Sequence, residues 1–293
     1  EIPLRLVGSE MCIRDREITM ADSQKGKIDM TTGHIMKNII LFAIPIIIGN
    51  VLQQLYTTVD ALVIGKYCGD TSLAAVGTSS QPVEVLLCVF LGIGTGVSIL
   101  ISQYTGARES GKVVSVCGTS ITLIYIVGIP IGILGWFAAP YILEFMKVPQ
   151  DVWGAALIYT RVVFLGTLGN LGYNMNAGIL RGLGDSKASL WFLVVSCVSN
   201  IVFDLLFVAG FGMDVAGAAL STSIAMFISW IVSIVYIRKK FPEIQFTYLP
   251  RRFSGTMMKA ILAIGLPVGL NNSLYSLGHV ALQTFNNSQG AIF

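Results

Sequence analysis

Four ionisable residues interrupt the long apolar stretches of this 293-residue sequence: Asp60, Glu84, Arg161 and Asp204. A charged side chain inside a bilayer costs at least about 2.5–3.5 kcal/mol, so residues of this kind usually line a path for ions or substrates. Two of them are aspartates, whose charge a proton or a small cation can neutralise. The chemistry to consider first is therefore the binding and release of a small cation or a proton.

Further polar residues fall near the two aspartates. Asn200 lies four residues before Asp204, a spacing that puts both side chains on one face of a helix. Counting the helical rise from the ends of the apolar stretches places five residues at a similar depth, in the outer half of the membrane: Asp60, Tyr159, Asn200, Asp204 and Thr222.

These residue types offer two carboxylates, an amide oxygen and hydroxyl groups. Hard cations prefer such oxygen ligands, so the set indicates a Na⁺ site, and a carboxyl group in apolar surroundings can instead carry a proton. The alternative is that Asp60 and Asp204 only cap helix ends in the outer interface. Glu84 can make a buried hydrogen bond or take part in transport, and Arg161 can pair with a carboxylate or extend to the membrane surface.

The elements that position these residues follow from composition. The chain is 54% apolar and 12% charged, about half the charged fraction of soluble domains. About 20 mostly apolar residues cross a bilayer. The sequence predicts an all-α polytopic membrane protein with the beginning of a seventh helix near residue 257 and six complete transmembrane helices at 36–64, 72–103, 113–143, 152–179, 187–211 and 215–237.

The distribution of Lys and Arg predicts the orientation. The N-terminal segment and the second, fourth and sixth junctions, with the adjoining helix ends, hold thirteen of these residues, whereas the opposite side holds Lys66 and Lys147. Basic residues accumulate on the cytoplasmic side. We therefore expect a multi-pass protein of the cytoplasmic (inner) membrane with a cytoplasmic N-terminus.

The chain divides into segments of different character. Residues 1–16 resemble a translated adapter sequence and are treated as a non-native scar, and 17–35 form a cytoplasmic tail. Residues 36–237 form the six-helix lobe, 238–256 a basic, proline-bearing cytoplasmic linker, and 257–293 the start of a second lobe. Residues 37–55 match 259–277, with lysine, proline and asparagine at the same spacing. Parallel repeats of this kind are a known transporter plan. The second copy stops within a span, so we expect a fragment.

Several classes of protein do not fit. The net charge of +3 gives no sign of nucleic-acid binding. Residues 106–113, GARESGKV, have phosphate-loop spacing, but Val113 stands where Ser or Thr would bind magnesium, and the segment joins two apolar stretches. The two histidines, His34 and His279, lie far apart, and the five cysteines form no CxxC pair. We expect no enzyme and no cofactor.

Four stretches carry a family resemblance: Pro45 through Asp60, GTGVSILISQYTGAR at 94–108, NAGILRGLGDSK at 176–187 and SNIVFDLLFVAGFGMDVAGAALST at 199–222. They resemble the multidrug and toxic compound extrusion (MATE) family, from about residue 30 onward. The resemblance implies two six-helix lobes around a central cleft. It also implies export of organic cations in exchange for Na⁺ or H⁺, in a full-length form that is monomeric in the bilayer.

The resemblance also assigns residues. It places the cation site of the first lobe on Asp60, Asn200, Asp204 and Thr222, with Tyr159 and Asn176 close by. It marks Pro45 as the bend of the first helix and puts Gln53 on the cleft. Two alternatives remain: a flippase for lipids or saccharide precursors in the same superfamily, which usually carries more cationic side chains, and a membrane-embedded enzyme.

Overall fold

The computed structural model describes residues 35–244 and 253–288. In a bilayer each backbone N–H and C=O must be paired within its own segment, and long apolar sequences therefore form helices. The described elements are α2 (Ile35–Tyr67), α3 (Asp70–Gly106), α4 (Ser110–Phe145), α5 (Gln150–Gly182), α6 (Ser186–Asp204), a π-helix (Leu205–Gly210), α7 (Asp214–Lys240), a 3₁₀ turn (Pro242–Ile244) and α8 (Gly255–Ser288). The predicted scar, nearly all of the N-terminal tail and the centre of the linker lie outside the described residues.

Seven of the described helices are long and apolar enough to cross a membrane. Six confirm the predicted spans, with ends that differ from the predicted ones by at most three residues. The prediction of an incomplete seventh span was wrong. The apolar part of α8 runs for 28 residues, about 42 Å at helical rise, which exceeds the hydrocarbon core of about 30 Å. The Asn and Ser residues near its middle do not end the helix.

The turn between α5 and α6 shows how the junction residues act. Gly184 has φ 85°, a conformation that favours glycine, and ends α5. Asp185 then caps α6 by accepting a hydrogen bond from the Ala188 N–H at 3.2 Å. The second oxygen of Asp185 accepts from Tyr236 and from Lys240, each at 2.8 Å. This cluster joins the turn to the end of α7.

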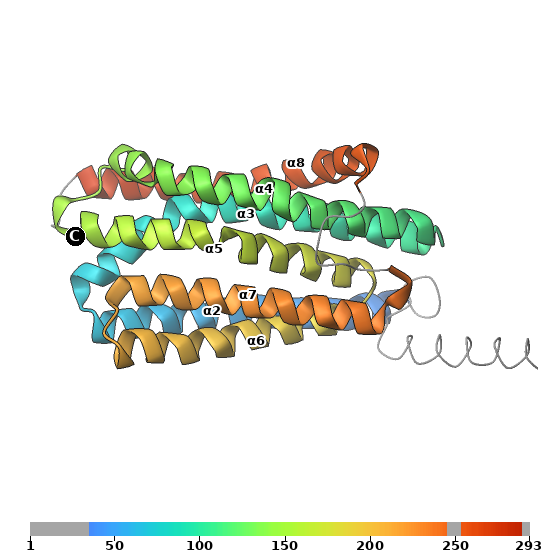
Figure 1. Cartoon of the computed structure of the whole chain (residues 1–293), viewed down its shortest axis with the longest axis horizontal. Helices are drawn as coiled ribbons and strands as arrows, with labels where there is room; N and C mark the ends of the chain where they lie inside the picture. The colour runs from blue at the N-terminus through green and yellow to red at the C-terminus, as the bar shows by residue number, and fades with distance from the viewer. Residues whose placement is uncertain (1–34, 245–252, 289–293) are drawn as a thin grey trace, which may run out of the picture.

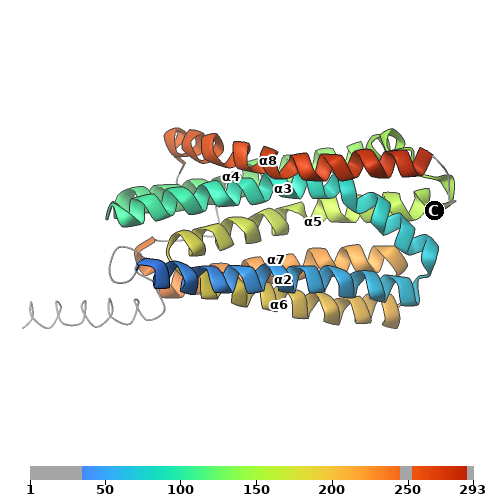
Figure 2. The same cartoon turned by 180° about the vertical axis from the view of Figure 1, so that it is seen from behind.

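The helices form two layers (Figures 1 and 2). One layer contains α2, α6 and α7, and the other contains α3, α4 and α8, while α5 lies between them and packs against α3, α4 and α7. Large apolar side chains of α2 remain exposed, among them Ile39, Ile47 and Leu55. The main buried core lies instead around α3, α4, α5 and α7.

Glycine contacts bring α3 close to two of its neighbours, α5 and α8. A Cβ atom at Gly178 of α5 would overlap the carbonyl oxygen of Gly94. On another face of α3, Gly92 meets Gly269 and Gly96 meets Gly265 of α8. Glycines four residues apart allow helix backbones to approach directly. Gly92, Gly94 and Gly96 thus lie at close helix contacts.

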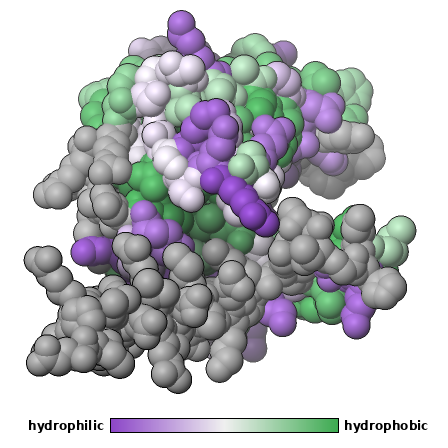
Figure 3. Space-filling model, turned by 90° about the vertical axis from the view of Figure 1, so that its right-hand side faces the viewer, coloured by the Kyte–Doolittle hydropathy of each residue, from purple (hydrophilic) through white to green (hydrophobic). Residues whose placement is uncertain are grey.

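Hydrophilic side chains gather at the end of the molecule where α3 and α5 finish and α2 begins (Figure 3). Exposed basic residues at this end include Lys37, Arg108, Lys112, Lys187, Arg238 and Lys239. The basic residues occur in every second junction, and every second junction of a helical bundle returns to the same end. The structure therefore places the basic junctions together on one side.

Candidate functional site

Two carboxyl groups meet where α2 packs against α6. Asp204, the last residue of α6, is 0% exposed, and Asp60 of α2 is half-buried beside it. The two carboxyl groups lie close enough to interact with each other. Two ionised carboxylates at close range repel each other. A proton on one of them, or a cation between their oxygens, would relieve this repulsion.

The neighbouring hydrogen bonds point toward Asp204. Ser221 of α7 donates to Asp204 Oδ1. The Asn200 amide satisfies its surroundings when its nitrogen donates to Asp204 Oδ2 at 2.9 Å and its oxygen accepts from Thr222 Oγ1 at 3.1 Å. Tyr56 in turn donates to Thr222 Oγ1 at 3.3 Å. Because both oxygens of Asp204 already accept hydrogen bonds, a proton bound by the pair would sit on Asp60.

One oxygen of this cluster lacks a partner. Asp60 Oδ1 is buried and makes no hydrogen bond to any described residue. Buried polar atoms are nearly always paired, so such an atom often marks a bound ion or water. Tyr56 of α2 and Tyr159 of α5 lie close to both carboxyl groups.

The donor set fits a small hard cation or a proton. Among the described residues, no three His, Cys, Asp or Glu side chains come together as a metal site. The cluster instead offers two carboxyl groups, one amide oxygen and several hydroxyl oxygens, a set of ligands that suits Na⁺ and also a proton. The structure thus brings Asp60, Tyr159, Asn200, Asp204 and Thr222 together at one depth.

The backbone changes form next to the carboxyl pair. Directly after Asp204, α6 continues as a π-helix over Leu205–Gly210. Single π turns occur frequently at functional sites because they alter which way the following side chains point. The sequence predicted one continuous helix over 187–211 and gave no sign of this change.

Sequence analysis also missed two residues of the cluster, Tyr56 and Ser221. Tyr56 precedes Asp60 by four residues and so shares its helix face. Ser221 adjoins Thr222, yet adjacent residues of a helix point in different directions, so depth counting alone could not show that both reach α6. Spacing could have identified Tyr56, whereas Ser221 required the packing of α7 on α6.

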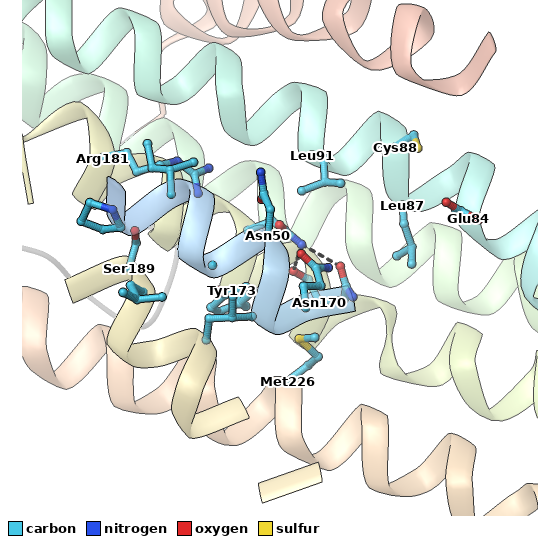
Figure 4. A pocket seen from close by; sticks show the side chains of 17 residues that line it. Asn50, Glu84, Leu87, Cys88, Leu91, Asn170, Tyr173, Arg181, Ser189 and Met226 are labelled. Atoms are coloured by element: carbon cyan, nitrogen blue, oxygen red, sulfur yellow. Dashed lines mark hydrogen bonds between the residues drawn. The ribbon is translucent and has the colours of Figure 1, made fainter. Parts of the chain in front are cut away.

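A cavity of about 220 Å³ lies between this cluster and the end where α2 begins. Pro45 and Gln53 line it, together with residues of α3, α5, α6 and α7 (Figure 4). Asn176 does not line it. This asparagine is fully buried, and its amide nitrogen donates to Ser233 of α7 at 2.8 Å.

Glu84 and Arg161 each have two possible roles from the sequence, and their surroundings differ in the structure. Glu84 is exposed and lines the cavity. Arg161 lies over the ring of Trp136, with 5.3 Å between the guanidinium carbon and the ring centre, and its Nε is buried without a hydrogen-bond partner among the described residues. Neither of the two predicted alternatives for Arg161 describes this stacking.

Known proteins share this sequence pattern. The sequence model of the MatE family matches residues 45–206. The Bacillus subtilis protein named "Probable multidrug resistance protein YpnP" is 32% identical over 262 residues, which cover 89% of this chain and 58% of that protein. "Probable multidrug resistance protein YoeA" from the same organism is 30% identical over 264 residues, 88% of this chain and 57% of that protein. The chain thus spans a little over half the length of the curated relatives it matches.

Solved structures are similar in fold. A structure described as the inward-facing conformation of a multidrug resistance MATE family transporter of the MOP superfamily is 28% identical, with a TM-score of 0.73, over 79% of this chain and 53% of that one. A structure described as the outward-facing conformation of such a transporter is 29% identical, with a TM-score of 0.72, over 80% of this chain and 52% of that one. The chain is about equally similar to both conformations.

Proposed function

Because the chain belongs to the multidrug and toxic compound extrusion (MATE) family, we propose that it acts in the cation-coupled export of organic cations and other drugs across the cytoplasmic membrane. Members of this family are transporters and not enzymes, which excludes a membrane-embedded enzyme. The chain itself is a multi-pass membrane protein with seven membrane-length helices among its described residues. The names of its relatives support drugs as the substrates.

One observation carries the coupling part of the proposal. Asp60 and Asp204 meet as a carboxyl pair within the membrane-spanning bundle, and Asp60 Oδ1 has no partner among the described residues. When Na⁺ or H⁺ enters, it neutralises the pair. When it leaves, two like charges face each other, which weakens the contact between α2 and α6. Ion binding and helix packing are linked in this way.

That linkage supports an antiporter working by alternating access. Moving one elementary charge down the membrane potential supplies about 2.3 kcal/mol per 100 mV, which the carboxyl pair would pass to drug export. The similarity to both inward-facing and outward-facing structures is consistent with a lobe that keeps its shape while the opening changes sides. Pro45 and Gln53, which line the cavity, would lie on the drug path, and Asn176 would hold α5 against α7.

Reconstitution tests this proposal. Proteoliposomes containing the product of the complete open reading frame would be loaded with a fluorescent organic cation, and its movement would be followed under an imposed Na⁺ gradient or an imposed pH gradient. We expect one of the two gradients to drive movement against the drug gradient. Movement under neither gradient would contradict the proposed coupling.

The proposed orientation has its own test. With the N-terminus in the cytoplasm, the turns beside Gln150 and Met213 face outward and the turn beside Lys187 faces inward. We expect a membrane-impermeant maleimide added to intact cells to label Gln150→Cys and Met213→Cys but not Lys187→Cys. Labelling of the Lys187 variant in intact cells would reverse the orientation. Permeabilised cells, in which all three should react, provide the control.

A further inference from the structure

Arg181 differs from the other basic residues at its end of the molecule. Lys187, Arg238 and Lys239 are exposed, whereas Arg181 is half-buried and lines the cavity. Its neighbours there include Tyr173 and Ser189. Among the described residues, no carboxylate forms an ion pair with it. A guanidinium that faces a cavity without an acidic partner is available to an anionic ligand.

The cavity is asymmetric in charge. Arg181 lies at one end and Glu84 at the other (Figure 4). Gly182 packs on the backbone of Ser98, fourteen residues beyond Glu84 on α3, so the two charges are separated by about 20 Å along the bundle. An anionic group is therefore attracted to Arg181 at one end and repelled by Glu84 at the other. This difference sets the orientation of a ligand with one charged group.

The walls between these ends are amphipathic. Asn50, Asn170 and Asn174 provide amides, and the Asn174 amide donates to Asn170 at 2.8 Å. The apolar wall consists of Leu87, Leu91, Leu193 and Met226. A free inorganic anion would leave this apolar surface uncovered. A volume of about 220 Å³ suits a two-ring aromatic acid and is too small for a phospholipid with its chains.

We propose that this cavity binds amphipathic organic anions, with the carboxylate of the ligand at Arg181 and its apolar body against Leu91, Leu193 and Met226. The guanidinium fork matches a carboxylate in two parallel hydrogen bonds. The inference goes beyond the proposed function, which centres on organic cations, because it adds anions as a class of ligand for the cavity and gives their orientation. It does not depend on ion coupling, since binding requires no gradient.

Calorimetric titration of the purified chain in detergent tests the assignment. The probes are naphthalene-1-acetate and its neutral amide, which share one apolar body and differ in charge. A charge-assisted hydrogen bond discriminates by about tenfold or more, and we expect the acetate to bind the parental chain tighter by that factor. This comparison needs no variant and so does not depend on whether a substituted chain folds.

Variants then locate the charge. We expect Arg181→Gln to lower acetate affinity to that of the amide, Arg181→Lys to restore part of the difference, and Lys187→Gln, which removes an exposed charge nearby, to change neither. Equal affinities of the two probes in the parental chain, or equal losses in the Arg181 and Lys187 variants, would overturn the proposal. Displacement of the acetate by dioleoylphosphatidylglycerol would also overturn it and assign the site to lipid. None of these results would bear on ion-driven transport.

Discussion

The two sides of this helix bundle are held together by different kinds of contact. Where α2, α6 and α7 meet, side chains from three helices form hydrogen bonds around Asp60 and Asp204. Where α3 meets α5 and α8, glycines bring the backbones together, as at Gly94 with Gly178 and at Gly92 with Gly269. Under the proposed function, the first interface depends on protonation or ion binding, whereas the second depends on the absence of side chains.

This difference indicates which interface can respond to ions. A carboxyl pair changes its interaction from attraction to repulsion when the ion leaves, so the contact between α2 and α6 can alter with ion occupancy. The strength of a glycine contact does not change with ion occupancy, and its backbones are already close-packed. We call the contact region of α2, α6 and α7 around Asp60 and Asp204 the polar side, and that of α3, α5 and α8 the glycine side. We infer that α3, α5 and α8 provide a fixed frame against which the polar side can rearrange. The predictions below test this division.

The largest effect is expected at the carboxyl pair. Asp60→Asn and Asp204→Asn keep the side-chain volume but remove the carboxyl group proposed to bind Na⁺ or H⁺. Export driven by the ion gradient should be lost, because one coupled charge supplies about 2.3 kcal/mol per 100 mV, or roughly fiftyfold in drug gradient. Drug efflux from cells expressing the complete open reading frame is the measurement, with membrane insertion checked by immunoblot.

A matched control separates this role from a general effect of charge. Asp151, an exposed carboxylate in the first turn of α5, should tolerate the same change to Asn without loss of export. If both cluster variants export drug at the parental rate, the carboxyl pair has no coupling role, and Asp60 and Asp204 would only be structural.

Much of the polar side could be predicted from the sequence. The spacing of Asn200 and Asp204 gave their shared face, and helical rise gave the depth of Asp60 and Thr222, because both follow from local geometry. The π turn after Asp204 and the contribution of Ser221 could not be predicted, since they depend on how α7 packs against α6. The direction of Arg181, into the cavity and not to the surface, also depends on packing.

The glycine side was less accessible to sequence analysis. Nothing in the sequence indicates which helices the glycines near residue 94 contact, because this depends on how the helices pack. The repeat match at 259–277 placed Pro267 opposite Pro45 in register, yet the second copy was expected to stop within its span. In the structure, α8 continues to Ser288, and Ser273 donates to the backbone of α3 at Val85, at 3.2 Å. This hydrogen bond between helices pairs a polar residue of α8 inside the bundle.

The second prediction concerns the fixed frame. In an open helix position, Gly→Ala stabilises by up to about 1 kcal/mol, but at Gly178 the added Cβ would overlap the carbonyl oxygen of Gly94. We expect Gly178→Ala to destabilise the chain by about 1–3 kcal/mol through overpacking. Gly154 lies on the same helix with no atom within 4 Å of the added carbon, so Gly154→Ala should be neutral or stabilising. Thermal unfolding in detergent, followed by tryptophan fluorescence, compares the two. Equal melting temperatures would mean that the contact between Gly178 and Gly94 can accommodate a methyl group.

The third prediction concerns a polar contact whose two charges already pair with each other. Like the glycine contact, it should lose stability when one of its residues is substituted. Asp185 is buried and bonded to Lys240 and Tyr236 at the opposite end of the α6–α7 pair from Asp204. Asp185→Asn should lower stability by about 1–2 kcal/mol, because a partly buried charged partner is left with a weaker acceptor. Glu109→Gln breaks an exposed pair with Lys112 and should have almost no effect. A fall in melting temperature for Glu109→Gln as large as for Asp185→Asn would contradict this reasoning.

The smallest effect is expected at Cys68, which follows α2 on the polar side and lies outside the membrane-spanning segments. Partial burial, with Asp214 beside the sulfur, raises the pKa of its thiol to about 12. Only the thiolate reacts with maleimide. With the other cysteines replaced, the labelling rate of Cys68 should therefore rise about tenfold per pH unit throughout pH 7–10. Met213→Cys, an exposed position on the same side, should instead level off near the ordinary thiol pKa of about 8.5. A plateau for Cys68 near that pH would mean that the contact between the end of α2 and the start of α7 is open in solution, and the polar side would then be looser than the structure shows.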